Sequence, residues 1–191
     1  MSETAATPQG WPVMSIADAH ALLTSPDSPL EMEEKDIRGV KMRVWKNAPA
    51  SLRDVLEASR AHGTRDFLVY EDERVTFEEH YRAVVKFAHV LKDKYGVKKG
   101  DRVTIAMRNY PEWVISFWAI TTIGAIVVPL NAWWTGEELE YGLSDSGSKV
   151  AVVDGERLDT LKPYLKDLGL EGLVVVRGEG DLAGGGDWQD L

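Results

Sequence analysis

Strand-like and helix-like segments alternate along the second half of the chain, and this alternation restricts the possible folds more than any other feature. Four short runs rich in aliphatic and β-branched residues are expected to be strands, namely 102–106, 126–128, 149–153 and 173–176. The intervals between them have the apolar spacing of helices, and the first of these helices opens at Pro111, a favoured first helical position. Parallel strands need such crossover connections. The sequence therefore predicts an α/β fold, a layered, doubly wound, mostly parallel sheet with flanking helices.

Three helix starts are marked by a hydroxyl residue followed three residues later by an acid. They are Ser51 with Asp54, Thr76 with Glu79, and Thr135 with Glu138. The helix that begins after Thr76 should extend to Gly96, and a further helix is expected over 156–168. Residues 67–70 and 75–77 are expected to pair as a hairpin before the long helix.

The region before Ser51 reads as an addition to the main domain. Residues 15–23 have helical apolar spacing, and residues 31–45 alternate around Arg38-Gly39 as in a β-hairpin. We therefore expect an N-terminal helix and β-hairpin before the main sheet. The expected domain limits are 1–14, a disordered leader without signal-peptide character; 15–50, the helix and hairpin extension; 51–177, the α/β subdomain; and 178–191, a glycine-rich linker toward a missing remainder of the protein.

The run 113–130 contains no charged residue and is long enough to cross a bilayer. Gly124 interrupts the run, Pro129 lies near its end, and residues 125–128 are β-rich. A buried helix followed by a buried strand explains these features better than a membrane span, so we expect no transmembrane segment.

Composition excludes several classes of function. The net charge is −9, which disfavours binding to nucleic acid or to an anionic membrane surface. The chain has no cysteine, so disulfides, thiolate nucleophiles and cysteine metal sites are excluded. These properties fit a cytoplasmic protein.

No complete catalytic set can be recognised in the sequence. A glycine-rich phosphate loop between strand and helix is missing, as is a Gly-x-Ser-x-Gly elbow. The histidines show no helical metal-pair spacing; they are His20, His62, His80 and His89. The prediction is therefore no catalytic, cofactor-binding or metal-binding residue within this chain.

Three segments in order carry a resemblance to a known family. They are residues 74–79 (Arg-Val-Thr-Phe-Glu-Glu), 100–109 (Gly-Asp-Arg-Val-Thr-Ile-Ala-Met-Arg-Asn) and 118–131, which ends in Gly-Ala-Ile-Val-Val-Pro-Leu-Asn. Together they resemble the N-terminal portion of the adenylate-forming (AMP-binding) superfamily, and the resemblance runs from about residue 52 to 176. The tryptophans at 133 and 134 favour the acyl-CoA synthetase or fatty-acid–CoA ligase type over amino-acid-adenylating domains.

The resemblance implies a two-step reaction in the whole enzyme, which activates a carboxylic acid with ATP and Mg²⁺ and transfers the acyl group to CoA. The family's phosphate loop, Thr-Glu motif, ribose-binding Asp and C-terminal Lys do not occur here, so the chain alone is expected to be inactive. Its implied partners are the rest of the parent chain and the acid. The alternative is a non-catalytic α/β binding or oligomerisation module, with a possible homodimer formed through residues 15–45.

Ligands of open α/β sheets bind beyond the carboxyl ends of the strands. This rule makes the residues after the first two strands the pocket-side candidates, namely Arg108, Asn109, Asn131, Trp133 and Trp134. The alternative for these side chains is packing against the missing remainder of the enzyme.

Overall fold

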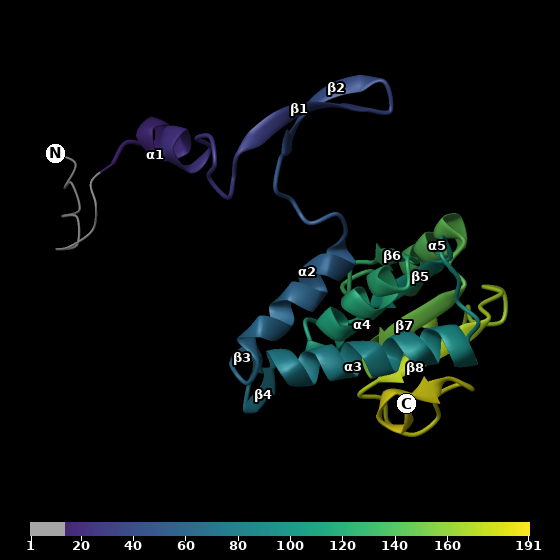
Figure 1. The fold of residues 1–191 in the computed structure, drawn as a ribbon. Coiled ribbons are helices and arrows are strands. Elements are labelled where there is room, and N and C mark those ends of the chain that lie inside the picture. The colour runs from purple at the N-terminus through teal and green to yellow at the C-terminus, as the bar shows by residue number, and fades with distance from the viewer. Residues whose placement is uncertain (1–13) are drawn as a thin grey trace, which may run out of the picture. The chain divides into compact units, whose positions relative to one another are not determined.

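The computed structural model describes residues 14–191, which belong to two compact units divided between Ala50 and Ser51 (Figure 1). Of the expected leader, residues 1–13 lie outside the described residues.

The first unit contains the expected helix and hairpin. Helix α1 spans Ile16–Leu23, and the side chain of Ser15 caps it by accepting a hydrogen bond from the Asp18 N–H. Strands β1 (Met32–Ile37) and β2 (Val40–Trp45) pair antiparallel. Their turn has positive φ at both central residues, 53° and 86°, as hairpins with two-residue turns require. No residue of 14–50 is buried, so these elements form no core of their own.

The second unit is built on a five-stranded parallel sheet of order β6–β5–β7–β8–β9. The strands are β5 (Arg102–Ala106), β6 (Ile126–Pro129), β7 (Val150–Asp154), β8 (Gly172–Val176) and β9 (Gly186–Asp187). The predicted fold class is confirmed, because crossover helices join the first four strands and the sheet is flanked by helices.

Alternating side chains of the strands feed two separate cores. On β7, Val150 and Val152 pack with α2 (Leu52–Ser59), α3 (Phe77–His89) and α4 (Pro111–Thr122). Ala151 and Val153 pack instead with the second helical layer, formed by α5 (Gly136–Ser146) and α6 (Gly155–Leu161). Because both faces of β7 are covered, all five of its residues are buried and apolar except for the last, Asp154.

Local capping signals fix the helix starts as predicted. Thr76 and Glu79 form a reciprocal capping box at α3, and Thr135 with Glu138 forms another at α5. The hairpin before α3 consists of β3 (Asp66–Tyr70) and β4 (Glu73–Thr76). Helix α3 continues as a π-helical turn, Val90–Lys94, before Gly96 adopts a φ of 59°.

Two segments differ from the expectation. Helix α6 ends at Leu161 rather than near residue 168, because Pro163 cannot supply a backbone N–H and its ring clashes with the preceding turn. The segment 178–191, expected to be a linker, holds β9, which pairs with β8. Within it the Trp188 ring also lies 4.5 Å from the ring of Phe87. The apolar end of this segment therefore packs against the domain.

The charge-free run 113–130 forms most of α4 and all of β6, as predicted. Within residues 14–191, no helix has the length and apolar character needed to cross a membrane.

Candidate functional site

The carboxyl ends of the parallel strands meet along one edge of the sheet. The chain passes from β5 outward to β6 and then crosses back to β7, on the other side of β5. The strand order thus reverses between β5 and β7, and such a reversal opens the crevice where doubly wound sheets bind ligands. The segments 107–110 and 130–135, which follow β5 and β6, and 154–157, which begins at the last residue of β7, define this edge, called here the carboxyl edge.

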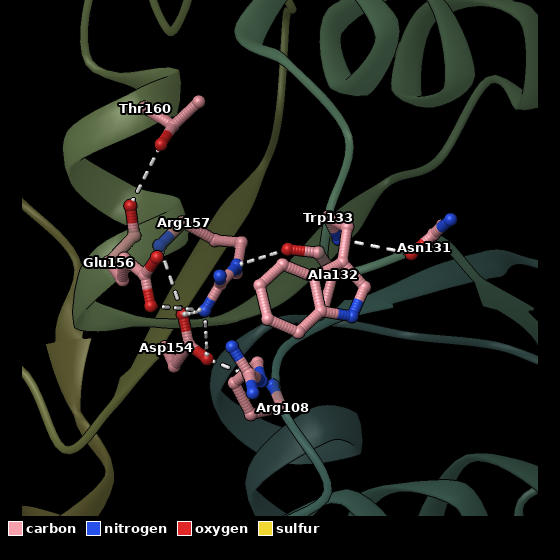
Figure 2. A network of polar contacts seen from close by, with 8 residues as sticks. All are labelled: Arg108, Asn131, Ala132, Trp133, Asp154, Glu156, Arg157 and Thr160. Atoms are coloured by element: carbon pink, nitrogen blue, oxygen red, sulfur yellow. Dashed lines mark hydrogen bonds and ion pairs between the residues drawn. The ribbon is translucent and has the colours of Figure 1, made fainter.

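A buried ion pair joins all three segments of the carboxyl edge (Figure 2). The side chains of Asp154 and Arg157 are 3% and 4% exposed, and Arg157 Nη1 lies 2.9 Å from Asp154 Oδ2 and 3.1 Å from Oδ1. Asp154 Oδ2 also accepts the backbone N–H of Arg108 at 2.9 Å. Arg157 Nε donates to the carbonyl oxygen of Ala132 at 2.7 Å. One pair of side chains therefore contacts segments that are 46 and 25 positions away in the sequence.

The hydrogen bonding of this pair is complete on the carboxylate side. Asp154 Oδ1 accepts the Arg157 backbone N–H at 2.9 Å, which caps α6, so each carboxylate oxygen accepts two hydrogen bonds. Glu156 adds a second, exposed carboxylate 3.0 Å from Arg157 Nη1. Burying charges is costly unless their hydrogen bonds are satisfied. Here the Asp154 carboxylate is satisfied by two backbone N–H groups and by the Arg157 guanidinium.

Next to this pair, the side chain of Arg108 stacks on Trp133 (Figure 2). The guanidinium carbon of Arg108 lies 3.8 Å from the centre of the indole ring, while Trp133 is 72% exposed. Asn131 orders the same turn, because its Oδ1 accepts the Trp133 backbone N–H at 3.0 Å. Among residues 14–191, no carboxylate pairs with the Arg108 guanidinium.

The five sequence-predicted residues are thus divided by the structure. Arg108, Asn131 and Trp133 come together at the carboxyl edge. Asn109 is exposed beside them, and its side chain has no hydrogen-bond partner among the described residues. Trp134 is half-buried and packs into the α5–α6 core, where a Cβ on Gly142 would lie 3.1 Å from its ring.

A second arginine network, missed by the sequence reasoning, lies after β8. Arg177 Nη2 is 2.8 Å from Glu73 Oε2, and its Nε is 3.1 Å from Glu112 Oε1. Its guanidinium lies 4.7 Å from the Tyr110 ring centre and 5.0 Å from that of Tyr70. Partial burial opposes the charge of Arg177, but Glu112 and Glu73 outweigh burial and raise its pKa above the ordinary value.

Neither Arg157 nor Arg177 is marked in the sequence by anything other than its position shortly after a strand. The rule that selected Arg108 also applies to residues following β7 and β8, and its full use would have included Arg157 and Arg177. Their partners could not be found this way, because Ala132, Glu73 and Glu112 lie in distant segments.

The carboxylates near these arginines do not suit a metal ion. Within residues 14–191, no three His, Asp or Glu side chains converge in a manner that could hold a metal ion. The carboxylate of Asp154 is fully used by its N–H donors. No step at Mg²⁺ or ATP can be assigned to these side chains.

Comparison with known proteins identifies the family. The family model described as AMP-binding enzyme matches residues 55–183, which include the sheet strands β5 to β8 and the carboxyl edge. The chain belongs to the AMP-binding enzyme family. The resemblance in the three sequence segments is thereby confirmed.

Curated members of the AMP-binding family show acyl-CoA ligases among the relatives. A long-chain-fatty-acid–CoA ligase of Escherichia coli O6:H1 is 34% identical over 131 residues, which cover 66% of this chain and 23% of the relative. An acetyl-coenzyme A synthetase of Sinorhizobium medicae is 36% identical over 110 residues, 54% of this chain and 17% of the relative.

Solved structures agree with this assignment. The anthranilate CoA ligase AuaEII, in complex with anthranoyl-AMP, matches with a TM-score of 0.70 and 30% identity over 75% of this chain and 28% of that one. A long-chain-fatty-acid–CoA ligase from Archaeoglobus fulgidus matches with a TM-score of 0.61 and 29% identity over 70% of this chain and 29% of that one. The chain thus spans less than a third of the length of these relatives.

Proposed function

We propose that this chain is the N-terminal part of an ATP-dependent acyl-CoA ligase. The observation that carries the proposal is the match of residues 55–183 to the AMP-binding family, with acyl-CoA ligases among the relatives. The whole enzyme would join a carboxylic acid to AMP from ATP, releasing pyrophosphate, and would then pass the acyl group to the thiol of CoA with release of AMP. ATP, Mg²⁺ and CoA are its proposed cofactors and co-substrates, and the cytoplasm, where these are abundant, is its proposed location.

Within that enzyme we assign a pocket-side position to Arg108, Asn109, Asn131 and Trp133. The support is their place beyond the carboxyl ends of β5 and β6, together with an arginine that has no carboxylate partner among the described residues. Trp134 instead supports the loop from below, because its ring packs into the α5–α6 core.

The test is an assay of the complete reading frame that encodes this chain. The full-length protein, given Mg²⁺-ATP and CoA, should release AMP only when a carboxylic acid is added, in a panel from acetate to long-chain fatty acids and aromatic acids. Residues 1–191 alone should release none. Acid-independent AMP release, or no release with any acid, would count against the assignment, and so would activity of the 191-residue chain.

A second role, self-association through the first unit, is favoured by the hairpin. The strand register places Ile37, Val40, Met42 and Val44 on one face, together with the paired Glu33 and Lys35. The first three of these apolar residues are 41–59% exposed. The opposite face carries charge pairs across the strands, Glu34 with Arg43 and Asp36 with Lys41.

Sedimentation over a range of concentrations tests this role. A dimer of the intact chain should dissociate in the variant Val40→Glu, whereas Lys41→Glu, on the charged face, should leave the mass unchanged. A monomer at every concentration would remove this role.

A further inference from the structure

We propose that Arg157 is a positioning residue, which holds the segments after β5 and β6 together so that the Arg108 guanidinium stays stacked on Trp133. The functional meaning of this arrangement rests on the proposed function, in which both residues face the pocket. The structural claim itself concerns only residues of this chain.

The contacts form an unbroken path between the two stacked residues (Figure 2). Arg157 Nε donates to the carbonyl oxygen of Ala132, the residue directly before Trp133, at 2.7 Å. Arg157 Nη1 bonds both oxygens of Asp154, and Asp154 Oδ2 accepts the backbone N–H of Arg108 at 2.9 Å. Arg108 is thus held at its own backbone N–H, and Trp133 is held through the carbonyl group of the preceding residue, Ala132.

The stack has little else to hold it. The Trp133 side chain is largely in solvent, and among residues 14–191 the Arg108 guanidinium has no hydrogen bond or ion pair. An exposed cation–π contact is a weak interaction between two mobile side chains. The backbone positions that Arg157 fixes therefore determine whether the two groups meet.

The shape of the guanidinium is what the geometry requires. A planar fork can bond a carboxylate with one nitrogen and a carbonyl in another segment with a second nitrogen, whereas the ammonium of lysine is a single point charge. The variant Arg157→Lys should therefore keep the ion pair with Asp154 and lose the bond to Ala132, which separates positioning from charge pairing.

Arg102 provides a matched control. It also donates to backbone carbonyls, with Nε to Ser146 at 2.9 Å and Nη2 to Gly147 at 2.8 Å, but it lies at the start of β5, away from the carboxyl edge. The variant Arg102→Lys makes the same chemical change and breaks an exposed arginine–carbonyl bridge at the other end of β5.

The experiment is NMR on the isotope-labelled 191-residue chain. The indole ring current should shift the Arg108 side-chain protons upfield, and the variant Trp133→Leu identifies this shift by removing it. We expect Arg157→Lys to abolish most of the shift while the amide signals of the other strands stay in place, and Arg102→Lys to preserve it.

A full upfield shift in folded Arg157→Lys would overturn the proposal, as would its loss in Arg102→Lys to the same extent. If Arg157→Lys does not fold, the double variant Asp154→Asn/Arg157→Gln, which leaves no buried charge, is expected to lose the shift and overturns the proposal if it keeps it. The unmodified chain gives an independent test, because an Arg157 Nε–H that exchanges with water as fast as that of Arg108 also contradicts the bond to Ala132.

These outcomes are separable from those of the ligase assay. The NMR readout reports the geometry of this chain alone, so an inactive full-length protein leaves it standing. Conversely, if the Arg108–Trp133 stack persists in Arg157→Lys, the ligase assignment is unaffected.

Discussion

Two of the sites that bury polar side chains in the second unit differ in their hydrogen bonding. At the carboxyl edge, the buried Asp154–Arg157 pair has a hydrogen-bond donor for every carboxylate lone pair. On α3, His80 is only 1% exposed, lies edge-on to Phe67 at 4.7 Å, and has no hydrogen-bond partner for either ring nitrogen among the described residues. The first site uses polarity to connect distant segments, whereas the second uses an imidazole to fill apolar space.

The difference shows in how each site should respond to change. A satisfied pair is sensitive to losing one member, because the other is left charged and buried. A buried imidazole without a hydrogen-bond partner instead makes the stability of the fold depend on pH, because burial lowers the pKa of His80 from 6.5 to about 4.

The largest expected effect is that of Arg157→Met, which leaves the Asp154 carboxylate without its cation. We expect the free energy of unfolding at pH 7 to fall by about 3–5 kcal/mol, measured by urea denaturation. The double variant Asp154→Asn/Arg157→Met should recover much of this loss, because no buried charge remains. A loss under about 1 kcal/mol for the single variant would show that the pair contributes little.

The next effect is acid destabilisation through His80. The unfolded chain binds the proton at a pKa near 6.5 and the folded chain only near 4. The contribution is therefore complete above pH 6.5 and is lost as the pH falls toward 4, by about 3 kcal/mol in total.

Urea denaturation at several pH values between 7 and 4 measures this loss. The variant His80→Phe should remove that part of the pH dependence, whereas His89→Gln, at an exposed position of the same helix, should leave it. Equal slopes for His80→Phe and the unmodified chain would disprove the assignment to His80.

Sequence reasoning succeeded where the determinant is local. The capping boxes at Thr76 and Thr135 and the apolar strand runs need only neighbouring residues, so α3, α5 and the sheet strands followed directly. It failed at α6, because Leu158, Leu161 and Leu165 keep helical spacing past Pro163, whereas the helix ends at Leu161. Grouping Arg108 with Trp133 needed only the rule for carboxyl ends of strands.

The remaining features of the site depend on strand register, which the sequence does not display. The bond from Arg157 to Ala132 exists because β5, β6 and β7 end side by side. Trp133 and Trp134 look alike in the sequence, yet Trp133 is exposed, whereas Trp134 is half-buried and packs against the α5–α6 core.

The smallest expected effect is at Arg177, whose side chain is 31% exposed, more than at either of the two buried sites. Two substitutions there separate the loss of charge pairing from the relief of backbone strain. Arg177→Ala should lower the free energy of unfolding by about 1 kcal/mol, as exposed ion pairs do. Arg177 has a φ of 50°, which glycine adopts freely, so Arg177→Gly should lose less than Arg177→Ala. Thermal unfolding of both variants measures the difference, and a more stable alanine variant would refute the strain.

The two outer strands of the sheet have a consequence for how copies of this unit meet in solution. β6 has four residues and ends in Pro129, which has no N–H to offer, and β9 has two residues. Short edge strands with few unpaired backbone N–H and C=O groups offer little for another strand to pair with. The edge strands of this sheet therefore disfavour aggregation by edge-to-edge strand pairing between copies of this unit.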